Sequence, residues 1–463
     1  MRHVLTRVAG EVRRVVRESG CVLASRVLAA WLLAAGASMA TAAPLMPHLS
    51  PHKTEGTVNC ASSTCHGSVT PWDGSNVLQN EYTTWTRMDK HTTAYRVLLN
   101  DESKRIAKNL GLTEGAHKAK ICLDCHAHNP SGPVGERFVQ SEGIGCEGCH
   151  GPSGKWIGPH TVEGRTHAQN VADGLYPTAN PTAQARLCLS CHFGDESRFV
   201  THRIMGAGHP RISFEIKTFT AIQPQHWKVD ADYIQRKGSY DPLRVWAIGQ
   251  AIAAQQILDV IADPKRRDGL FPELVAFDCH ACHHAMSDKR WNARLGTGPG
   301  VVRVNDSNLL MLRAIVRATD PSASAAFDAQ VKAMHLAVST GKKPAGKTEL
   351  DMVRELSASI GAMLPKLEKT SFPPATMRQV LLALIDESRE SSYSDYAGAE
   401  QAYMAITNVA NSLIQSGTLT LNPQLRSGMA DLLKSLANDE RYKPDAFANQ
   451  LLALRGVVAA QAR

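Results

Sequence analysis

The sequence is short of three features, and each shortage excludes a class of protein. Lysine and arginine are scattered and do not cluster with aromatic residues, which make up only 6% of the chain, so the footprint of a nucleic-acid-binding protein is absent. The apolar run at residues 27–40 is too short to cross a bilayer as a retained helix. Beyond the N-terminal leader, no cysteine stands outside a closely spaced pair. We therefore expect no transmembrane segment, no nucleic-acid partner and one repeated task for the cysteines.

The N-terminal leader has the order of a secretory signal peptide. Arginine-rich residues 1–26 precede the apolar run, and the small residues of the sequence ATA follow it at 40–42. The pair Arg13 and Arg14 suggests the twin-arginine export route as an alternative, but the residues that normally surround such a pair are missing. We expect residues 1–42 to be removed by general secretion and the mature protein to work in the bacterial periplasm, or exported.

Ten of the 11 cysteines remain once the leader, which contains Cys21, is removed. Four of the five resulting pairs carry the motif Cys-x-x-Cys-His, in the order CLDCH, CEGCH, CLSCH and CHACH at residues 122–126, 146–150, 188–192 and 279–283. This motif attaches c-type haem: the two thiols add to the two vinyl groups on one edge of the porphyrin, and the imidazole of the next residue binds the iron.

Structural zinc and disulfides are the alternatives for these pairs. Zinc ribbons place two Cys-x-x-Cys units on one metal and need no histidine after each unit. Thioredoxin-like motifs do not occur in fours, and disulfides would leave the histidines unexplained. Repetition of the complete motif therefore favours haem attached to Cys122, Cys125, Cys146, Cys149, Cys188, Cys191, Cys279 and Cys282, with iron bound by His126, His150, His192 and His283.

The remaining pair lies in the stretch NCASSTCHGS at residues 59–68, where four residues separate Cys60 from Cys65. Both sulfurs can still reach the vinyl groups if the extra residues bulge outward, and His66 follows directly as an iron ligand. We expect this pair to bind one more haem, which makes five in all. The alternative is a Cys60–Cys65 disulfide, which would leave four haems.

Longer segments around the motifs resemble the multihaem cytochromes c of the cytochrome c-552/c-554 type. They are GIGCEGCHGPSGKWIGPH at 143–160, LCLSCHFGDES at 187–197, HRIMGAGHPRISFE at 202–215 and PQHW at 224–227, and the resemblance covers roughly residues 55–290. It implies covalent haems packed closely in pairs, mostly with two histidines on each iron. The first motif and the helical extension after residue 300 depart from the tetrahaem members of that family.

Thirteen of the 18 histidines in the mature chain remain for the distal side of at most five irons. The resemblance implies four distal ligands: His91, His160, His202 and His209. We add His117, five residues before Cys122, and note three close alternatives: His52, His167 and His226. A surface position or a hydrogen bond to a haem propionate is expected for His128, His280 and His284, and a structural role for His335.

Axial ligation separates an electron carrier from a catalyst, because an iron with two protein ligands offers no open site for a substrate. Histidines suffice for two on every iron, and no catalytic residue is assigned. The leading hypothesis is a multihaem c-type cytochrome that passes electrons, in a periplasmic or exported respiratory chain, between a quinol-linked or soluble donor and a terminal reductase or acceptor. The alternatives are a multihaem oxidoreductase acting on a small nitrogen or sulfur compound at a five-coordinate haem, and a redox or gas sensor.

The chain is predicted to be mainly α, with little regular sheet, and to divide into a pentahaem cytochrome domain at 43–298 and an α-helical domain at 299–463. Aromatic residues and helix-forming runs are sparse from 54 to 237, so porphyrin must fill much of the core there. A clear helix starts after the cap at Asp241 and stops at Asp263-Pro264. We expect it to pack against the last haem.

The final 160 or so residues contain no cysteine and one histidine. Apolar periodicity predicts helices near 307–318, 325–339, 349–364, 374–387, 397–415, 423–436 and 445–460. Separators between them are Pro344, Pro365, Pro373, Gly417 and Pro444. We expect a bundle or an array of helical hairpins that covers haem edges, or that docks the protein to a partner or to a second copy.

Overall fold

The computed structural model describes residues 44–73, 77–266, 273–284 and 301–461. Residues Leu45–Arg463 form one compact unit, which contains all five cysteine motifs. The predicted signal peptide at 1–42 and the domain boundary predicted at residue 298 lie outside the described residues.

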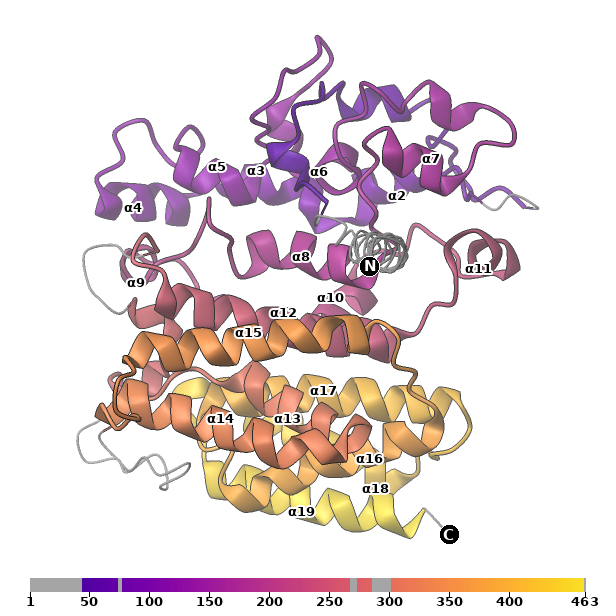
Figure 1. The fold of residues 1–463 in the computed structure, drawn as a ribbon. Helices are drawn as coiled ribbons and strands as arrows, with labels where there is room; N and C mark the ends of the chain where they lie inside the picture. The colour runs from indigo at the N-terminus through magenta and orange to yellow at the C-terminus, as the bar shows by residue number, and fades with distance from the viewer. Residues whose placement is uncertain (1–43, 74–76, 267–272, 285–300, 462–463) are drawn as a thin grey trace, which may run out of the picture. The chain divides into compact units, whose positions relative to one another are not determined.

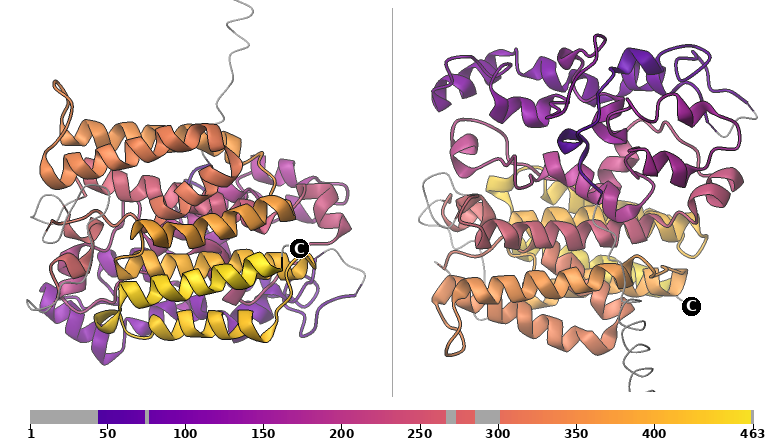
Figure 2. Two further views of the ribbon diagram at one scale, coloured as in Figure 1. Left: turned by 90° about the horizontal axis from the view of Figure 1, so that it is seen from below. Right: turned by 45° about the horizontal axis from the view of Figure 1, so that its top comes forward.

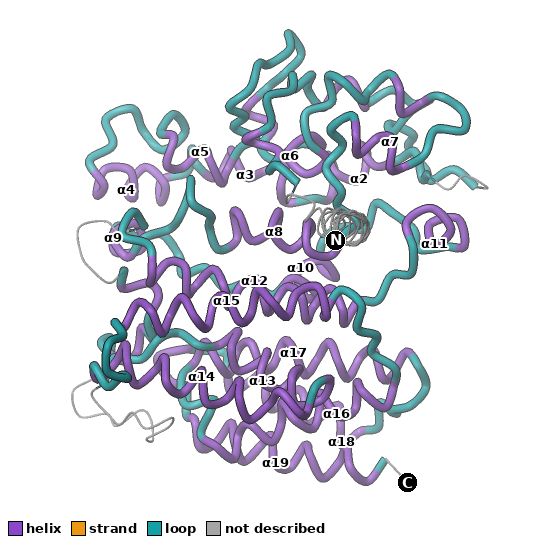
Figure 3. The backbone as a smooth tube through the Cα atoms, in the orientation of Figure 1, coloured by secondary structure: helices purple, strands orange, loops and turns teal. Residues whose placement is uncertain are grey.

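Helices supply the regular structure of this unit, and no extended sheet occurs among the described residues (Figure 3). Only isolated bridges are found there, such as the one between Thr54 and Val134. The prediction of a mainly α fold with little regular sheet is confirmed.

The first half of the unit consists of short helices joined by loops. These are α2 (Glu81–Met88), α3 (Ala94–Val97), α4 (Asp101–Leu110), α5 (Lys120–His126), α6 (Cys146–His150), α7 (His167–Ala172), α8 (Pro181–His192), α9 (His202–Gly206), α10 (Ile216–Ile222) and α11 (Ala231–Lys237). Their own apolar cores are small: one cluster is built around Leu98 and Leu123, and another around Ile106 and Ile204. This agrees with the expectation that the segment holds little apolar side-chain surface.

Longer helices make up the second half. They are α12 (Pro242–Ala262), α13 (Ser307–Thr319), α14 (Pro321–Thr340), α15 (Glu349–Leu367), α16 (Pro374–Asp386), α17 (Tyr396–Gln415), α18 (Pro423–Ser435) and α19 (Pro444–Ala460). All seven helices predicted after residue 300 are present, with ends within a few residues of those expected. Helices α18 and α19 pack side by side at the edge of this layer farthest from α5 and α6 (Figures 1 and 2).

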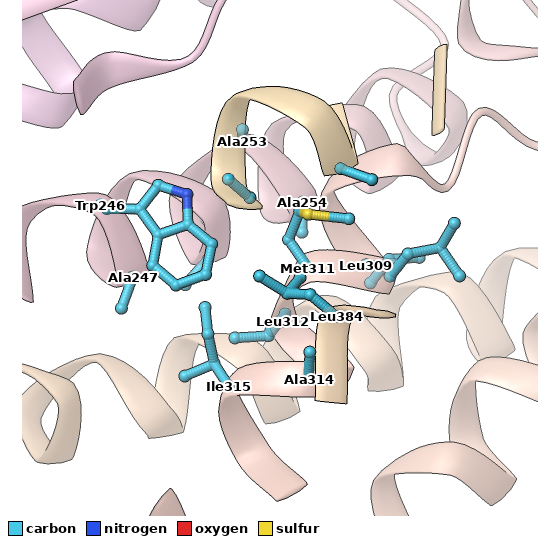
Figure 4. Packing of buried hydrophobic residues seen from close by; sticks show 14 of the residues in the cluster. Trp246, Ala247, Ala253, Ala254, Leu309, Met311, Leu312, Ala314, Ile315 and Leu384 are labelled. Atoms are coloured by element: carbon cyan, nitrogen blue, oxygen red, sulfur yellow. The ribbon is translucent and has the colours of Figure 1, made fainter. Parts of the chain in front are cut away.

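Helix α12 is the centre of the fold. The Asp241 carboxylate accepts hydrogen bonds from the backbone N–H groups of Leu243 and Arg244, at 3.0 and 3.1 Å, and so caps the helix as predicted. By length and composition α12 could cross a membrane, but 78% of its most apolar stretch is buried in the unit. It packs against α15 and α13 on one side and against α8 on the other (Figure 1). Apolar side chains of α12, α13 and α16 gather in one core, among them Trp246 and Leu384 (Figure 4).

Pro365 does not separate two helices as predicted. Helix α15 continues through it to Leu367, and the N–H of Glu368 still bonds the Leu364 carbonyl at 2.9 Å. The proline falls in the last turn, where a missing N–H removes one hydrogen bond without disrupting the preceding turns.

The core joins the motif-bearing segment to the C-terminal helices. Ala185 and Leu189 of α8 and Ile216 of α10 belong to the same buried cluster as α12, α13 and α17. Helix α8, which carries one of the haem motifs, therefore packs with its apolar face against the layer of C-terminal helices. This contact fixes one motif relative to the C-terminal half of the chain.

Candidate functional site

Three of the five motifs form the last turn of a helix. Helices α5, α6 and α8 end at His126, His150 and His192. Positions i, i+3 and i+4 of a helix share one face, so two cysteines and the following histidine point the same way. In the fifth motif, at 279–283, the N–H of the histidine bonds the carbonyl of the first cysteine at 2.8 Å and makes an equivalent turn. The spacing of the motif is thus explained by one turn of helix.

The first motif reaches a similar end by a wider turn. The N–H of His66 bonds the Cys60 carbonyl at 3.1 Å, across the two extra residues. Residues 62–64 are exposed, which is the outward bulge that the sequence required. All ten cysteines of the five motifs are free, so the alternative Cys60–Cys65 disulfide is not formed.

Each motif histidine faces a second histidine from elsewhere in the chain. The pairs, with the distances between ring centres, are His66 and His160 at 6.3 Å, His126 and His209 at 6.4 Å, His150 and His226 at 6.4 Å, His192 and His91 at 6.1 Å, and His283 and His202 at 6.1 Å.

This separation lies at the wide end of the range for ring packing, and it also fits one metal ion between two rings. With a metal–nitrogen bond of about 2 Å on each side, and each ring centre roughly 1 Å behind its nitrogen, the centres lie about 6 Å apart. Among the described residues, no group of three or more histidine, cysteine and carboxylate side chains converges as a metal site. The side chains are therefore grouped as axial pairs, which suits haem iron rather than tetrahedral zinc.

Hydrogen bonds orient the rings of six of these ten histidines. Four Nδ1 atoms lie next to backbone carbonyl oxygens: His126 to Ala94 at 3.0 Å, His160 to Ile157 at 2.6 Å, His209 to Pro210 at 2.8 Å and His226 to Pro224 at 3.4 Å. A carbonyl oxygen can only accept, so each Nδ1 carries the proton. That tautomer leaves the Nε2 lone pair free for a metal.

Two of the histidines have a carboxylate partner instead. His66 Nδ1 lies 2.9 Å from Glu81 Oε2, and His91 Nδ1 lies 2.8 Å from Asp89 Oδ1. These hydrogen bonds raise the pKa of both histidines. Burial would raise the pKa of Asp89, but hydrogen bonds led by that from His91 lower it to about 2. An anionic acceptor makes an imidazole a stronger electron donor to a bound metal.

Burial keeps three other motif histidines neutral. It lowers the pKa of His126, and it lowers the pKa of His150 to about 3 and that of His192 to about 4. A neutral imidazole is the form that binds metal. These sites are therefore set for metal rather than for proton transfer.

The pairing departs from expectation at one position. His91, His160, His202 and His209 each face a motif histidine, whereas His117 has no such ring contact among the residues that the structure describes. His226 stands opposite His150 instead. The signal was present in the sequence, because His226 belongs to PQHW, one of the segments that carry the family resemblance. Closeness to Cys122 along the chain favoured His117, whereas the histidines that face the motif histidines come from other parts of the fold.

The cysteines of different motifs shift one another's pKa, which indicates which motifs are neighbours. Cys146 lowers the pKa of Cys60, so the first motif lies close to the third. The Cys125 thiol does the same for Cys191 and lowers its pKa to about 6, which joins the second motif to the fourth. Burial, with smaller contributions from the cysteines of the fourth motif, raises the pKa of Cys149 to about 12. The third and fourth motifs are thus also close.

One buried carboxylate ties the first motif to the third. Glu147, the second residue of CEGCH, is 2% exposed and accepts backbone N–H bonds from Glu55, Gly56 and Ser153 at 2.9, 2.7 and 2.7 Å. Gly56 has φ +100°, and a Cβ there would collide with the Arg137 carbonyl. The chain leading into Cys60 is therefore held against α6.

One guanidinium ties the second motif to the fourth. Arg198 donates to the backbone carbonyl of Asp124 in CLDCH and, at 2.7 Å, to the hydroxyl of Ser190 in CLSCH. Its side chain is 8% exposed, and Asp195 accepts from its Nε at 3.3 Å. Each of the two motif couples thus has one buried charged residue between its members.

Comparison with known proteins agrees with this geometry. Residues 59–151 match the family of cytochrome c554 and c-prime, a segment that contains the first three motifs. No curated protein and no solved structure matches the chain. The matched segment is similar to the cytochrome c554 family and, with its haem-attachment motifs, supports a c-type cytochrome that binds haem covalently and transfers electrons.

Proposed function

We propose that the protein carries five covalently bound haems and passes single electrons along them in a periplasmic or exported respiratory chain. The observation that carries this proposal is the opposing histidine at all five motifs, with ring centres 6.1 to 6.4 Å apart. Haem iron held between two imidazoles changes oxidation state without changing its ligands.

The same observation favours a carrier over an enzyme. An oxidoreductase acting on a small nitrogen or sulfur compound needs one iron with an open position. At such a site the motif histidine would have no opposing histidine ring. Each of the five motif histidines has an opposing ring.

Adjacent motifs support a defined route for electrons. The mutual pKa shifts of the cysteines support a row in which the first motif lies next to the third, the third next to the fourth, and the fourth next to the second. His192 of the fourth motif and Cys279 of the fifth line one cavity. His202, which faces the fifth motif, begins helix α9, and His209, which faces the second motif, follows the end of that helix. Close spacing of successive centres favours electron tunnelling between them.

Exposure supports entry and exit at the two ends of this row. Cys65 in the first motif and Cys282 in the fifth are exposed, whereas the other eight motif cysteines are half-buried. Redox partners would therefore dock near the first and fifth haems. We propose a quinol-linked or soluble donor on one side, a terminal reductase or acceptor on the other, and removal of residues 1–42 on export.

The test measures haem number and coordination together. Intact mass of the mature holoprotein is expected to exceed that of the bare polypeptide by five haems, and the ferric protein is expected to give only low-spin magnetic spectra. The double variant Cys60→Ser/Cys65→Ser should weigh one haem less. A high-spin ferric signal, or a change in the reduced spectrum on adding carbon monoxide, would favour the enzyme.

A further inference from the structure

The ring of His192, in the fourth motif, is oriented by aromatic side chains. It makes no hydrogen bond to any residue that the structure describes. The bond that turns an imidazole has broad minima, so such a ring takes its plane from what packs on it. Phe214 lies nearly parallel to His192, with ring centres 4.6 Å apart and planes at 19°. Phe219 lies against the same imidazole at 5.9 Å and 55°. Aromatic packing therefore replaces the hydrogen bond at this motif.

The histidine that faces His192 is oriented by the same segment. His91 faces it with ring centres 6.1 Å apart and planes at 82°. The Asp89 carboxylate, which lies 2.8 Å from His91 Nδ1, also accepts a hydrogen bond from Gln223 at 3.0 Å. The two phenylalanines and Gln223 belong to residues 214–223, which comprise α10 and its flanks. This segment thus contacts one histidine directly and the other through a carboxylate, and so fixes the angle between their rings.

Helix α17 holds this segment in place. Gln401 donates to the Phe214 carbonyl at 2.9 Å, and Asn408 donates to the Glu215 carboxylate at 2.6 Å. The two amides are seven residues apart and share one face of α17. Glu215, Gln401 and Asn408 are all buried. Such bonds are firm anchors, because breaking one leaves a buried polar group without a partner.

Helix α12 supports α10 from another side. A Cβ at Gly249 of α12 would lie 2.5 Å from Ile216 Cγ2, so the two helices approach too closely for a larger residue there. Ile216, the first residue of α10, is 3% exposed. The ring that packs on His192 is therefore held by two helices that carry no haem motif, α12 and α17.

We propose that Phe214 is a positioning residue for the fourth motif: held by α17, it keeps the ring plane of His192 nearly perpendicular to that of His91. The inference rests on the proposed function, because it requires an iron between these two histidines. Crossed imidazole planes leave the iron orbitals nearly degenerate, which gives a highly anisotropic paramagnetic resonance signal. The C-terminal helices thereby act on the fourth iron through the orientation of its ligand.

Removing the ring tests the proposal in the holoprotein. Phe214→Leu should keep five haems by intact mass and stay low-spin. One of the three highly anisotropic ferric signals should shift or broaden, because the stack no longer holds His192 in one plane. Phe214→Tyr keeps the stacked ring and should restore that signal. The matched control is Phe138→Leu, whose ring lies against His128, a histidine outside the five facing pairs, and it should leave every signal unchanged.

The anchor on α17 has its own variant. Gln401→Leu removes the bond to the Phe214 carbonyl without touching the ring, and the same signal should move, by less than in Phe214→Leu. An unmoved signal in Phe214→Leu, or loss of one haem from it, would overturn the inference alone. A signal unmoved only in Gln401→Leu would overturn the role of α17. If the wild-type peptide with Cys188 and Cys191 is bare after digestion, the five-haem function fails as well.

Discussion

His150 and His226 face each other with ring centres 6.4 Å apart and ring planes at 86°. They lie on α6 and on the loop between α10 and α11, so the pair is made by the fold and not by a local motif. Under the proposed function, each distal ligand is such a histidine: it comes from a distant segment and lies opposite a motif histidine.

Replacing that distal ligand should open one iron. In His226→Ala the intact mass should be unchanged apart from the substitution, because the cysteines of the third motif hold the haem, while about one fifth of the ferric haem becomes high-spin and the reduced protein binds carbon monoxide. His117→Ala is the control and should stay entirely low-spin. A low-spin His226→Ala together with a high-spin His117→Ala would restore His117 as the ligand.

The angles between ring planes predict two classes of low-spin iron. Three pairs are close to perpendicular, at 77°, 82° and 86°, and two are closer to parallel, at 12° for His66 with His160 and 33° for His202 with His283. Crossed imidazole planes leave the iron orbitals nearly degenerate, which gives a highly anisotropic paramagnetic resonance signal, and parallel planes give an ordinary rhombic one. The ferric spectrum should contain both in a ratio near three to two. A spectrum with one class only would contradict the ring geometry.

The two carboxylate-bonded histidines should hold their haems at low potential. Glu81→Gln removes the anionic acceptor of His66 Nδ1, and the midpoint potential of the first haem should rise, by up to some tens of millivolts, because a weaker donor stabilises the ferric state less. His66 remains a ligand, so the haem count should not change. Glu102→Gln, an exposed change on α4, serves as the control. A lowered or unmoved potential in Glu81→Gln would rule out this role.

The buried carboxylate between the first and third motifs should contribute to stability. Glu147→Ala leaves three backbone N–H groups without acceptors, and the free energy of unfolding of the holoprotein should fall by about 2–4 kcal/mol. Glu147→Gln keeps one acceptor oxygen, so its free energy of unfolding should fall less. Denaturant unfolding followed by haem absorbance measures both. Equal stability of Glu147→Ala and wild type would show that the interaction is dispensable.

Acid should weaken the fold through Asp89. Hydrogen bonds led by that from His91 overcome burial and hold its pKa near 2, below its ordinary value of 3.8. The ionised carboxylate therefore stabilises the native state above pH 3.8, and this contribution is lost as the pH falls from there towards 2. Asp89→Asn should be less stable near neutral pH and should lose this part of the acid dependence. An unchanged acid profile in the variant would exclude Asp89 as its source.

The sequence by itself determined the attachment chemistry and the helices. Two cysteines and a histidine within one turn form a local pattern. The capped, periodic helices from Asp241 onward are also local features. Both can therefore be predicted from residues that are close together in the sequence. Only the tertiary structure decided that His226 stands opposite His150, that Glu147 and Arg198 join the motifs in couples, and that α12 and α17 wall the cavity at Cys279. An axial ligand needs only one nitrogen atom at the right position. The residues around a motif therefore do not tell which distant segment supplies the histidine opposite it.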